Sequence, residues 1–519
     1  MRVLLATLCF VVGVNAAPDL VLRNGLIYDG TGRAPFKGDV AIKDGRIIGV
    51  GNVARAGGSG KIIDVNGLAI APGFIDVHTH AENIVYHPKA ENFLRMGVTT
   101  LVLGNCGSSK LNLGEFYAKL EKNGFSPNIA SLIGHGTVRG QVMGGSLRRP
   151  PNATELAAMQ KHIAKAMEDG ALGMSTGLIY LPGVFARTDE LVALSKTVSS
   201  HGGIYASHMR SEGTNIFNAI DEVCTIAEQA KLPAHISHLK LAGRPMWGKH
   251  PQLLARLDQA RADGIRLTHD QYAYTASSTS LHQLLPDALI VGGANAFSQR
   301  IKSAKTHRET VAWMKDRLRR RQREDYSYAV IAYHKKDKRF NGLSVKEAAK
   351  LRYGNDDLDH QILLIFEVET NGGASAVFHG MHEDDARAFL RHPHTMFASD
   401  SSVRAFEVGV PHPRGYGNAA RFLARYTRDQ KQLKLEEAIR KLTSFPARTF
   451  QLKGRGELRK GFAADIVVFN PAKIKDNATF KAPHQYATGF RLVLVNGKAV
   501  VENDSHNAAG PGQVIRRAQ

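Results

Sequence analysis

Two histidines at alternate positions follow an apolar run and could bind a metal ion together. The run from Ala71 to Val77 leads into His78, Thr79 and His80. Side chains alternate across a strand, so His78 and His80 project to one face while Thr79 projects to the other. A lone histidine there would more often be a satisfied core residue, but two imidazoles aimed at one face favour a metal site.

Four more residues with metal-binding or proton-transfer chemistry end other apolar runs: Cys106, His208, His238 and Asp400. Each has an ordinary explanation when it is taken alone. A buried cysteine is a small apolar side chain, and an aspartate at a strand end often caps the next helix. Their shared placement is better explained by an active site, because barrel folds carry their chemistry at the carboxyl ends of the strands.

The elements that must position these residues alternate between apolar runs and helical stretches, as parallel βαβ units do. Eight runs predict strands, at residues 73–80, 98–106, 128–134, 171–178, 203–209, 233–240, 266–272 and 395–400. Eight such units predict an α/β fold of the (β/α)8 TIM-barrel type, with a doubly wound sheet as the competing fold. The long stretch between the seventh and eighth strands predicts an insertion at about 285–390.

Both ends of the chain are rich in short strand patterns instead. Asp44-Gly45 and Asn496-Gly497 each lie between alternating apolar residues, as type I′ hairpin turns do. Isolated hairpins cannot bury a face alone, so we expect the two ends to combine. The prediction is a small β-sandwich domain built from residues 18–70 and 451–519, attached to a barrel at 71–450.

The composition is that of an ordinary globular protein, with 519 residues, 43% of them hydrophobic, and a formal net charge of +21. The charge alone does not predict nucleic-acid binding, since no basic segment interleaved with aromatic residues accompanies it.

Residues 1–17 are typical of a signal peptide, and their apolar run is too short for a stable membrane span. We therefore expect export, to the periplasm or the medium, after cleavage. The sequence leaves the oligomeric state open.

Several motifs together resemble one known family. They are APGFIDVHTH, GNCG, STGLIYLPG, SHMRSEG, ISHLK, YAYTASST, HPRGYG, KLTSFPARTF, GRGELRKGFAADIVVFNP and PHQYATGF. The first resembles the amidohydrolase superfamily, and the set resembles its D-aminoacylase (N-acyl-D-amino-acid deacylase) branch. The resemblance runs from about Leu20 to Gln513 and is weakest across the insertion. HxH is shared by many metallohydrolases, whereas GNCG together with HPRGYG is much more specific.

The resemblance implies a metal site with zinc as its cofactor. Cys106, His208 and His238 would hold one zinc tightly, with the cysteine where other branches use a carboxylated lysine. A thiolate is anionic and a strong zinc ligand, so this replacement is chemically sound. His78 and His80 would line a second, weaker metal position. Asp400 would act as the general acid and base.

The resemblance also implies a small-molecule substrate, an N-acyl-D-amino acid with a free carboxylate. Lys240, Arg414 and Tyr274 would bind that carboxylate. Tyr180, in the STGLIYLPG segment, would either help polarise the scissile carbonyl or pack as an aromatic at the barrel mouth. Lys240 shares the strand parity of His238, which places both on one face. A related amidohydrolase acting on a cyclic amide, or on peptides with a D-residue, is the alternative enzyme. An exported, inactive binding protein is disfavoured by the full set of ligands.

Two substitutions depart from the family pattern near the site, and the segment between Asp400 and Arg414 is longer than usual, which puts the acyl or side-chain preference in doubt. Leu239 replaces a second histidine after His238, and strand parity points it away from the ligands. Ala273 replaces a proline between Tyr272 and Tyr274, which frees the backbone there. The exact position of Tyr274 is therefore less constrained than that of the metal ligands.

Overall fold

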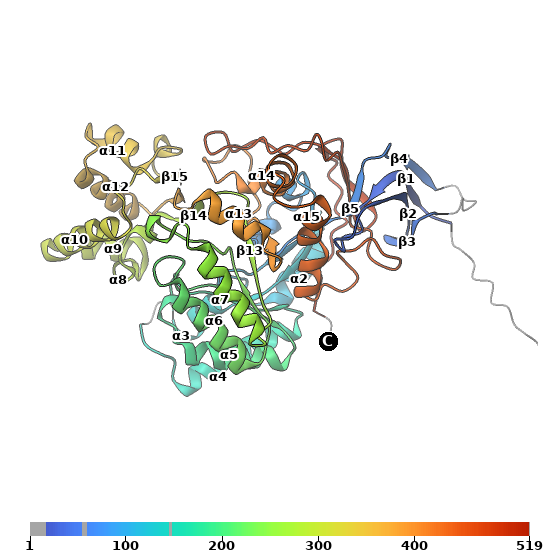
Figure 1. The fold of residues 1–519 in the computed structure, drawn as a ribbon. Coiled ribbons are helices and arrows are strands. Elements are labelled where there is room, and N and C mark those ends of the chain that lie inside the picture. The colour runs from blue at the N-terminus through green and yellow to red at the C-terminus, as the bar shows by residue number, and fades with distance from the viewer. Residues whose placement is uncertain (1–16, 54–59, 145–147, 518–519) are drawn as a thin grey trace, which may run out of the picture.

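The structure, a computed structural model, describes residues 17–53, 60–144 and 148–517. Of the signal peptide predicted at residues 1–17, all but the last residue lies outside the described residues, and export stays a prediction. Figure 1 shows a central body of strands and surrounding helices, with a β-rich domain at one end and a helical subdomain at the other.

Eight parallel strand segments form the central body. They are β6 (Phe74–Asp76), β7 (Val98–Leu103), β8 (Asn128–Ser131) with its continuation β9 (Ile133–Gly134), β10 (Gly173–Gly177), β11 (Ile204–His208), β12 (Ala234–Ile236), β13 (Leu267–Gln271) and β17 (Thr395–Phe397). One sheet has the order β17-β13-β12-β11-β10-β9 and the other the order β6-β7-β8, so the β8–β9 segment takes part in both. Each predicted strand contains one of these segments.

Backbone hydrogen bonds join the two sheets on both sides. Between the first and last strands, the Asp400 amide donates to the His78 carbonyl and the His80 amide donates to the Ser401 carbonyl, each at 2.8 Å. On the other side, the Leu172 amide, next to β10, donates to the carbonyl of Ser131 in β8 at 2.9 Å. The strands therefore close into a ring, which confirms the predicted (β/α)8 barrel over a doubly wound sheet.

Amphipathic helices cover the outside of the ring. They are α2 (Leu113–Asn123), α3 (His135–Met143), α4 (Ala153–Glu168), α5 (Thr188–Ser200), α6 (Ile216–Ala230), α7 (His250–Ala262), α13 (Glu383–Arg391) and α15 (Leu435–Leu442). Shorter helices fill the connections: α1 (Glu91–Leu94), α14 (Arg414–Arg421), the π-helix η6 (Phe422–Asp429) and α16 (Ser444–Thr449). Helix α4 begins at the expected cap, where Asn152 and Glu155 form a reciprocal capping box. The apolar faces of these helices pack onto the strands in one continuous core.

Strands from both ends of the chain share one nine-stranded sheet. They are β1 (Leu20–Ile27), β2 (Phe36–Lys43), β3 (Arg46–Gly51), β4 (Lys61–Asp64), β5 (Ala69–Pro72), β18 (Ile466–Phe469), β19 (Phe490–Val495), β20 (Lys498–Glu502) and β21 (Ser505–His506). The two ends meet where β5 pairs antiparallel with β18. Both predicted hairpin turns are present, with positive φ at Asp44, Gly45, Asn496 and Gly497 as type I′ turns require. Gly73 links β5 directly to β6, so this sheet leads into the barrel.

A subdomain with its own apolar core lies between β13 and β17. It contains β14 (Ser277–Ser280), α8 (Asp287–Ile290), α9 (Gly293–Ile301), α10 (Ala304–Arg320), β15 (Ala329–Tyr333), α11 (Val345–Tyr353), α12 (Leu358–Thr370) and β16 (Ser375–Phe378). Its strands pair antiparallel in the order β14-β16-β15. β14 connects the subdomain to the mouth of the barrel.

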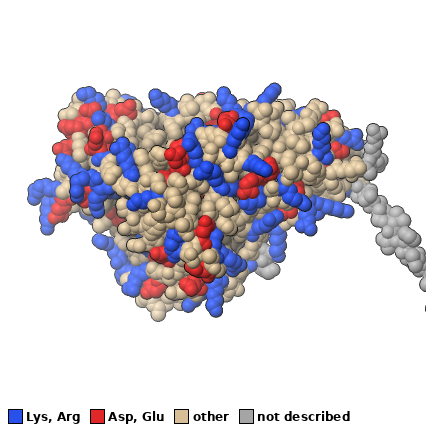
Figure 2. All heavy atoms as spheres, in the orientation of Figure 1, with Lys and Arg blue, Asp and Glu red and all other residues tan. Residues whose placement is uncertain are grey.

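The molecular surface carries both signs of charge. In Figure 2, Lys and Arg side chains are spread over the visible face among Asp and Glu. No helix in the described part of the chain is long and apolar enough to cross a membrane. The absence of a nucleic-acid partner stays a prediction.

Gly104, directly after β7, allows the chain to turn toward Cys106. Its φ is +76°, and a Cβ there would collide with the Leu132 carbonyl. Gly354, at the end of α11, has a similar φ of +72°, and a Cβ at that position would have no other atom within 4 Å. Both Gly104→Ala and Gly354→Ala place a side chain at positive φ, which costs about 1–2 kcal/mol, and only Gly104→Ala adds a backbone collision. We expect Gly104→Ala to lower the melting temperature much more, and equal shifts would contradict this role.

Candidate active site

A buried thiol surrounded by imidazoles lies at the carboxyl ends of four barrel strands. Cys106 follows β7, His78 follows β6, His208 ends β11 and His238 follows β12. The Cys106 Sγ lies 3.2 Å from His78 Nε2, 3.6 Å from His208 Nδ1 and 3.6 Å from His238 Nε2. The structure thus brings together four predicted ligands that are far apart in the sequence.

These distances suit a bound metal ion. Zinc–sulfur and zinc–nitrogen bonds at a tetrahedral angle would place sulfur and nitrogen about 3.5 Å apart. The Cys106–His208 and Cys106–His238 distances, both 3.6 Å, agree with that value. His238 presents its other nitrogen, Nδ1, to Glu212 at 2.8 Å, and such a carboxylate contact orients a metal-binding imidazole. The donor set of one thiol and several imidazoles therefore fits a divalent metal of the zinc type.

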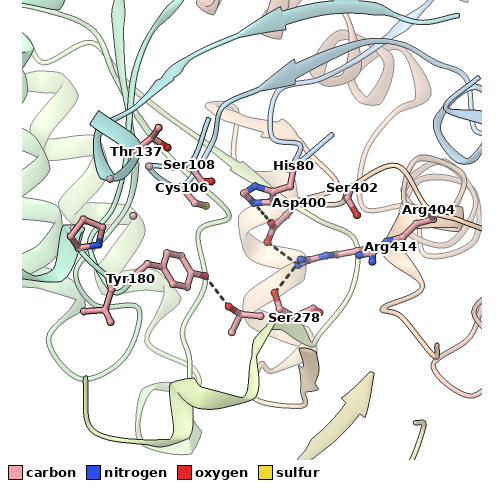
Figure 3. A pocket seen from close by; sticks show the side chains of 17 residues that line it. His80, Cys106, Ser108, Thr137, Tyr180, Ser278, Asp400, Ser402, Arg404 and Arg414 are labelled. Atoms are coloured by element: carbon pink, nitrogen blue, oxygen red, sulfur yellow. Dashed lines mark hydrogen bonds and ion pairs between the residues drawn. The ribbon is translucent and has the colours of Figure 1, made fainter. Parts of the chain in front are cut away.

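Asp400 lies beside this cluster with two partners of its own. One carboxylate oxygen lies 3.2 Å from His80 Nε2, and the other lies 2.9 Å from Arg414 Nη1. His78, His80 and Asp400 also form a group whose ligand atoms all lie within 4.8 Å of one another. Figure 3 shows the Arg414 guanidinium reaching toward Asp400 from the side opposite His80.

Three of these residues have a backbone conformation that L-residues rarely adopt. The φ angles of Cys106, His238 and Asp400 are +52°, +36° and +52°. Residues other than glycine are uncommon in this region, and such strain concentrates at functional sites. All three stand shortly after a strand, where the left-handed turn directs the side chain into the barrel mouth. The sequence predicted the residues but not this conformation.

Electrostatics favour the ionised forms of Cys106 and Asp400. Burial alone would raise the pKa of the Cys106 thiol, but the charge of His78 and hydrogen bonds with His208 and His238 lower that pKa well below its usual value. Burial would likewise raise the pKa of Asp400, and the Arg414 guanidinium, followed by His78, lowers it well below its usual range. The site therefore holds a thiolate, a metal ligand, close to an ionised carboxylate.

A cavity of about 500 Å³ opens onto these groups. Its lining includes His80, Cys106, Tyr180, Asp400 and Arg414. Figure 3 shows Tyr180 on one side and the Asp400–Arg414 pair on the other. The Tyr180 hydroxyl accepts a hydrogen bond from Thr279 of β14 at 3.3 Å, so the subdomain forms part of the wall. A substrate in this cavity would lie against both the thiol and the carboxylate.

Comparison with known proteins agrees with this geometry. The sequence profile of the amidohydrolase family matches residues 61–501. This chain belongs to the amidohydrolase family. It is 32% identical to a D-aminoacylase of Alcaligenes xylosoxydans xylosoxydans, over 96% of this chain and 98% of that protein.

Two solved structures extend the similarity to the fold of this amidohydrolase. A D-aminoacylase described as defining a novel subset of amidohydrolases has a TM-score of 0.81 and 32% identity, over 96% of this chain and all of that one. An N-acyl-D-glutamate deacylase from Bordetella bronchiseptica, complexed with zinc and a phosphonate inhibitor, has a TM-score of 0.81 and 29% identity over 96% of this chain and all of that one. These similarities confirm the family resemblance and the barrel with its β-sandwich domain.

Two residues predicted to bind a substrate carboxylate have other partners in this amidohydrolase. The Lys240 ammonium donates to Glu212 and lies 2.8 Å from His238 Nδ1. The Tyr274 hydroxyl donates to Asp476 at 2.7 Å. Neither side chain lines the cavity that contains Asp400. The structure therefore places Lys240 behind a metal ligand and Tyr274 in a separate polar contact.

Sequence reasoning missed three residues that support the site. Glu212, in the SHMRSEG motif, contacts both His238 and Lys240. Asp270, at the end of the seventh predicted strand, lies 3.4 Å from His78 Nδ1 and accepts the His238 amide at 2.8 Å. The ring of Tyr272 lies 4.7 Å from the Arg414 guanidinium carbon. Glu212 and Tyr272 lie in motifs of the family resemblance, and the position of Asp270 near the end of its strand was an available signal.

The two cysteines of the described residues, both free thiols, provide a matched test of the metal site. Cys106→Ala removes the only sulfur of the cluster, whereas Cys224→Ala removes a buried thiol from α6. We expect Cys106→Ala to lose its tightly held metal on dialysis, because His208 and His238 without an anionic ligand bind more weakly. Elemental analysis measures the occupancy, and Cys224→Ala should match the wild type. Full occupancy in Cys106→Ala would remove the thiol from the site.

Proposed function

We propose that this chain hydrolyses the amide bond of N-acyl-D-amino acids, releasing a carboxylate and a D-amino acid. One observation carries the proposal: the cavity is lined both by Cys106, the thiol of a cluster suited to a metal ion, and by the Asp400 carboxylate, which is paired with Arg414. Amide hydrolysis needs both an electrophilic metal and a proton carrier. The D-hand of the substrate is supported by the names of the similar proteins.

Zinc is the metal we propose for the tight site, with Cys106, His208 and His238 as ligands. When bound there, zinc supplies Lewis acidity to a substrate carbonyl and lowers the pKa of a water molecule. The thiolate favours zinc over hard cations such as magnesium. Glu212 fixes the orientation of His238 through its Nδ1. A zinc-complexed deacylase among the similar structures supports this choice.

His78, His80 and Asp400 form the second, weaker position of the proposal. Their ligand atoms lie within 4.8 Å of one another, so they also suit a cation. His80 is partly exposed to the cavity, with a side-chain exposure of 33%. This set also lacks a thiolate, the ligand that favours zinc at the tight site, so the proposed second position binds the metal less tightly.

Asp400 is the proton carrier in this proposal. Its carboxylate is ionised at neutral pH because Arg414 lies 2.9 Å away. It can therefore accept a proton from the attacking water and return that proton to the departing amine nitrogen. The contact with His80 at 3.2 Å holds the carboxylate toward the cavity.

Tyr180 supplies a neutral hydrogen-bond donor on the opposite wall. Burial, and then the negative charge of Cys106, raise the pKa of the Tyr180 hydroxyl well above its usual value. The hydroxyl therefore keeps its proton and can donate to the carbonyl oxygen on which negative charge develops. Such preorganised donors stabilise the transition state of acyl transfer.

A hydrolysis panel tests the proposed function directly. Purified, metal-loaded protein is assayed against N-acetyl D- and L-amino acids, a cyclic amide, and a dipeptide with a D-residue. We expect cleavage of the N-acetyl-D-amino acids and little of their L-enantiomers. Preferential cleavage of the L-forms, of the cyclic amide or of the dipeptide would replace the proposed substrate class.

Asp400→Asn tests the proton carrier. The substitution keeps the size of the side chain and removes its basicity, so kcat should fall by about 10²-fold or more. Metal content measured on the same sample should show the tight site still filled, since Asp400 is not one of its proposed ligands. Turnover near the wild-type rate would assign the proton transfers to another group.

A further inference from the structure

A second arginine, Arg404, lines the same cavity as the Asp400–Arg414 pair. It lies in the segment between β17 and α14, and Figure 3 shows it beside Arg414. Arg404 is neither a proposed metal ligand nor a partner in the proposed proton transfers.

Arg404 has no carboxylate partner among the described residues of the cavity. Asp400 is the one carboxylate among the described residues that line this cavity, and it is paired with Arg414 and His80. Among the described residues, no carboxylate lies within ion-pair distance of Arg404. Its Nε donates to the Ser401 hydroxyl at 3.3 Å, and neither terminal nitrogen has a hydrogen-bond partner within the described chain. The guanidinium therefore faces the cavity without a counter-ion.

The surroundings hold Arg404 in this place. Asn92 accepts the Arg404 amide at 3.2 Å and donates to the carbonyls of Ser402 and Gly415. A Cβ on Gly415 would lie 3.2 Å from the Arg404 Cγ and 3.3 Å from its Nε, so the glycine leaves room for the side chain. The arginine stem is thus packed against α14, and its conformational freedom is reduced before any ligand binds.

Burial works against a charge at this position. Burial, and then the nearby Arg414, lower the pKa of Arg404 to about 10, so the side chain still carries its charge at neutral pH. Two guanidinium groups on one wall repel each other, and a ligand anion placed between them would relieve that repulsion. Arg–carboxylate pairs are strong and directional, which makes a carboxylate the best-fitting anion.

We propose that Arg404 binds a carboxylate of the substrate directly, next to Arg414. The inference rests on the proposed function and sharpens it, because it replaces the cation that Lys240 was expected to provide. Lys240 is engaged by Glu212 behind His238, so the α-carboxylate needs another partner. A side-chain carboxylate, as in an N-acyl-D-glutamate, offers the same chemistry.

Arg404→Met is compared with the wild type on four substrates: N-acetyl-D-glutamine, its α-methyl ester, N-acetyl-D-glutamate and the α-methyl ester of N-acetyl-D-glutamate. Loss of one charge-assisted contact should reduce kcat/KM about 10- to 100-fold more for a substrate that carries the bound carboxylate than for the analogue in which that carboxylate is an ester or an amide. Arg404→Lys keeps the charge and should recover part of the loss. Arg391→Met, an exposed arginine at the end of α13, should leave the acid-to-ester ratio unchanged.

The four substrates separate the two sources of the carboxylate. If Arg404 binds the α-carboxylate, both acids lose rate relative to their α-esters by the same factor. If it binds the side-chain carboxylate, each glutamate compound loses more rate than the corresponding glutamine compound, and the α-ester makes no difference. Equal losses on all four substrates would overturn the proposal. If the wild type cleaves none of them, the proposed function fails, and calorimetric binding of the same intact compounds then tests Arg404 with the same comparisons.

Discussion

The hydrogen bond from the Asp400 amide to the His78 carbonyl, 2.8 Å long, closes the barrel between its first and last strands. It joins residues from opposite ends of the barrel sequence, and the chemistry depends on that junction. His80 and Asp400 meet because their strands are neighbours in the ring. Cys106 lies beside His78 for the same reason, one strand further along. The parallel arrangement sends every strand end to one side of the ring, so residues far apart in sequence share a single cavity.

Much of this arrangement could be predicted from the sequence. Apolar runs separated by helical patterns indicated the eight strand segments, and metal-binding side chains at their ends indicated the site. The hairpin turns at Asp44-Gly45 and Asn496-Gly497 were predictable because few residue pairs accept positive φ at both positions. These features depend on local pattern and stereochemistry, which a single sequence records.

The structure does not place Lys240 on the cavity wall as predicted, because the prediction extended the alternation of side chains beyond the end of a strand. Alternation of side chains holds only within a strand, and β12 ends at Ile236. The left-handed turn at His238 then redirects the chain, and Lys240 reaches Glu212 instead of the cavity. Tyr274 likewise follows the end of β13 at Gln271, and its partner Asp476 is remote in sequence. Contacts made after a strand end depend on tertiary packing that no local pattern specifies.

The sheet that both chain ends share affects how the molecule is made. β5 ends at Pro72, but its partner β18 begins only at Ile466. At a synthesis rate of about 5–20 residues per second, on the order of tens of seconds pass between the synthesis of β5 and that of β18. During this time β5 has an unpaired edge, which can pair wrongly with other chains. The ribosome must therefore release nearly the whole polypeptide before this sheet is complete, and a nascent chain halted before β18 leaves that edge open to chaperones.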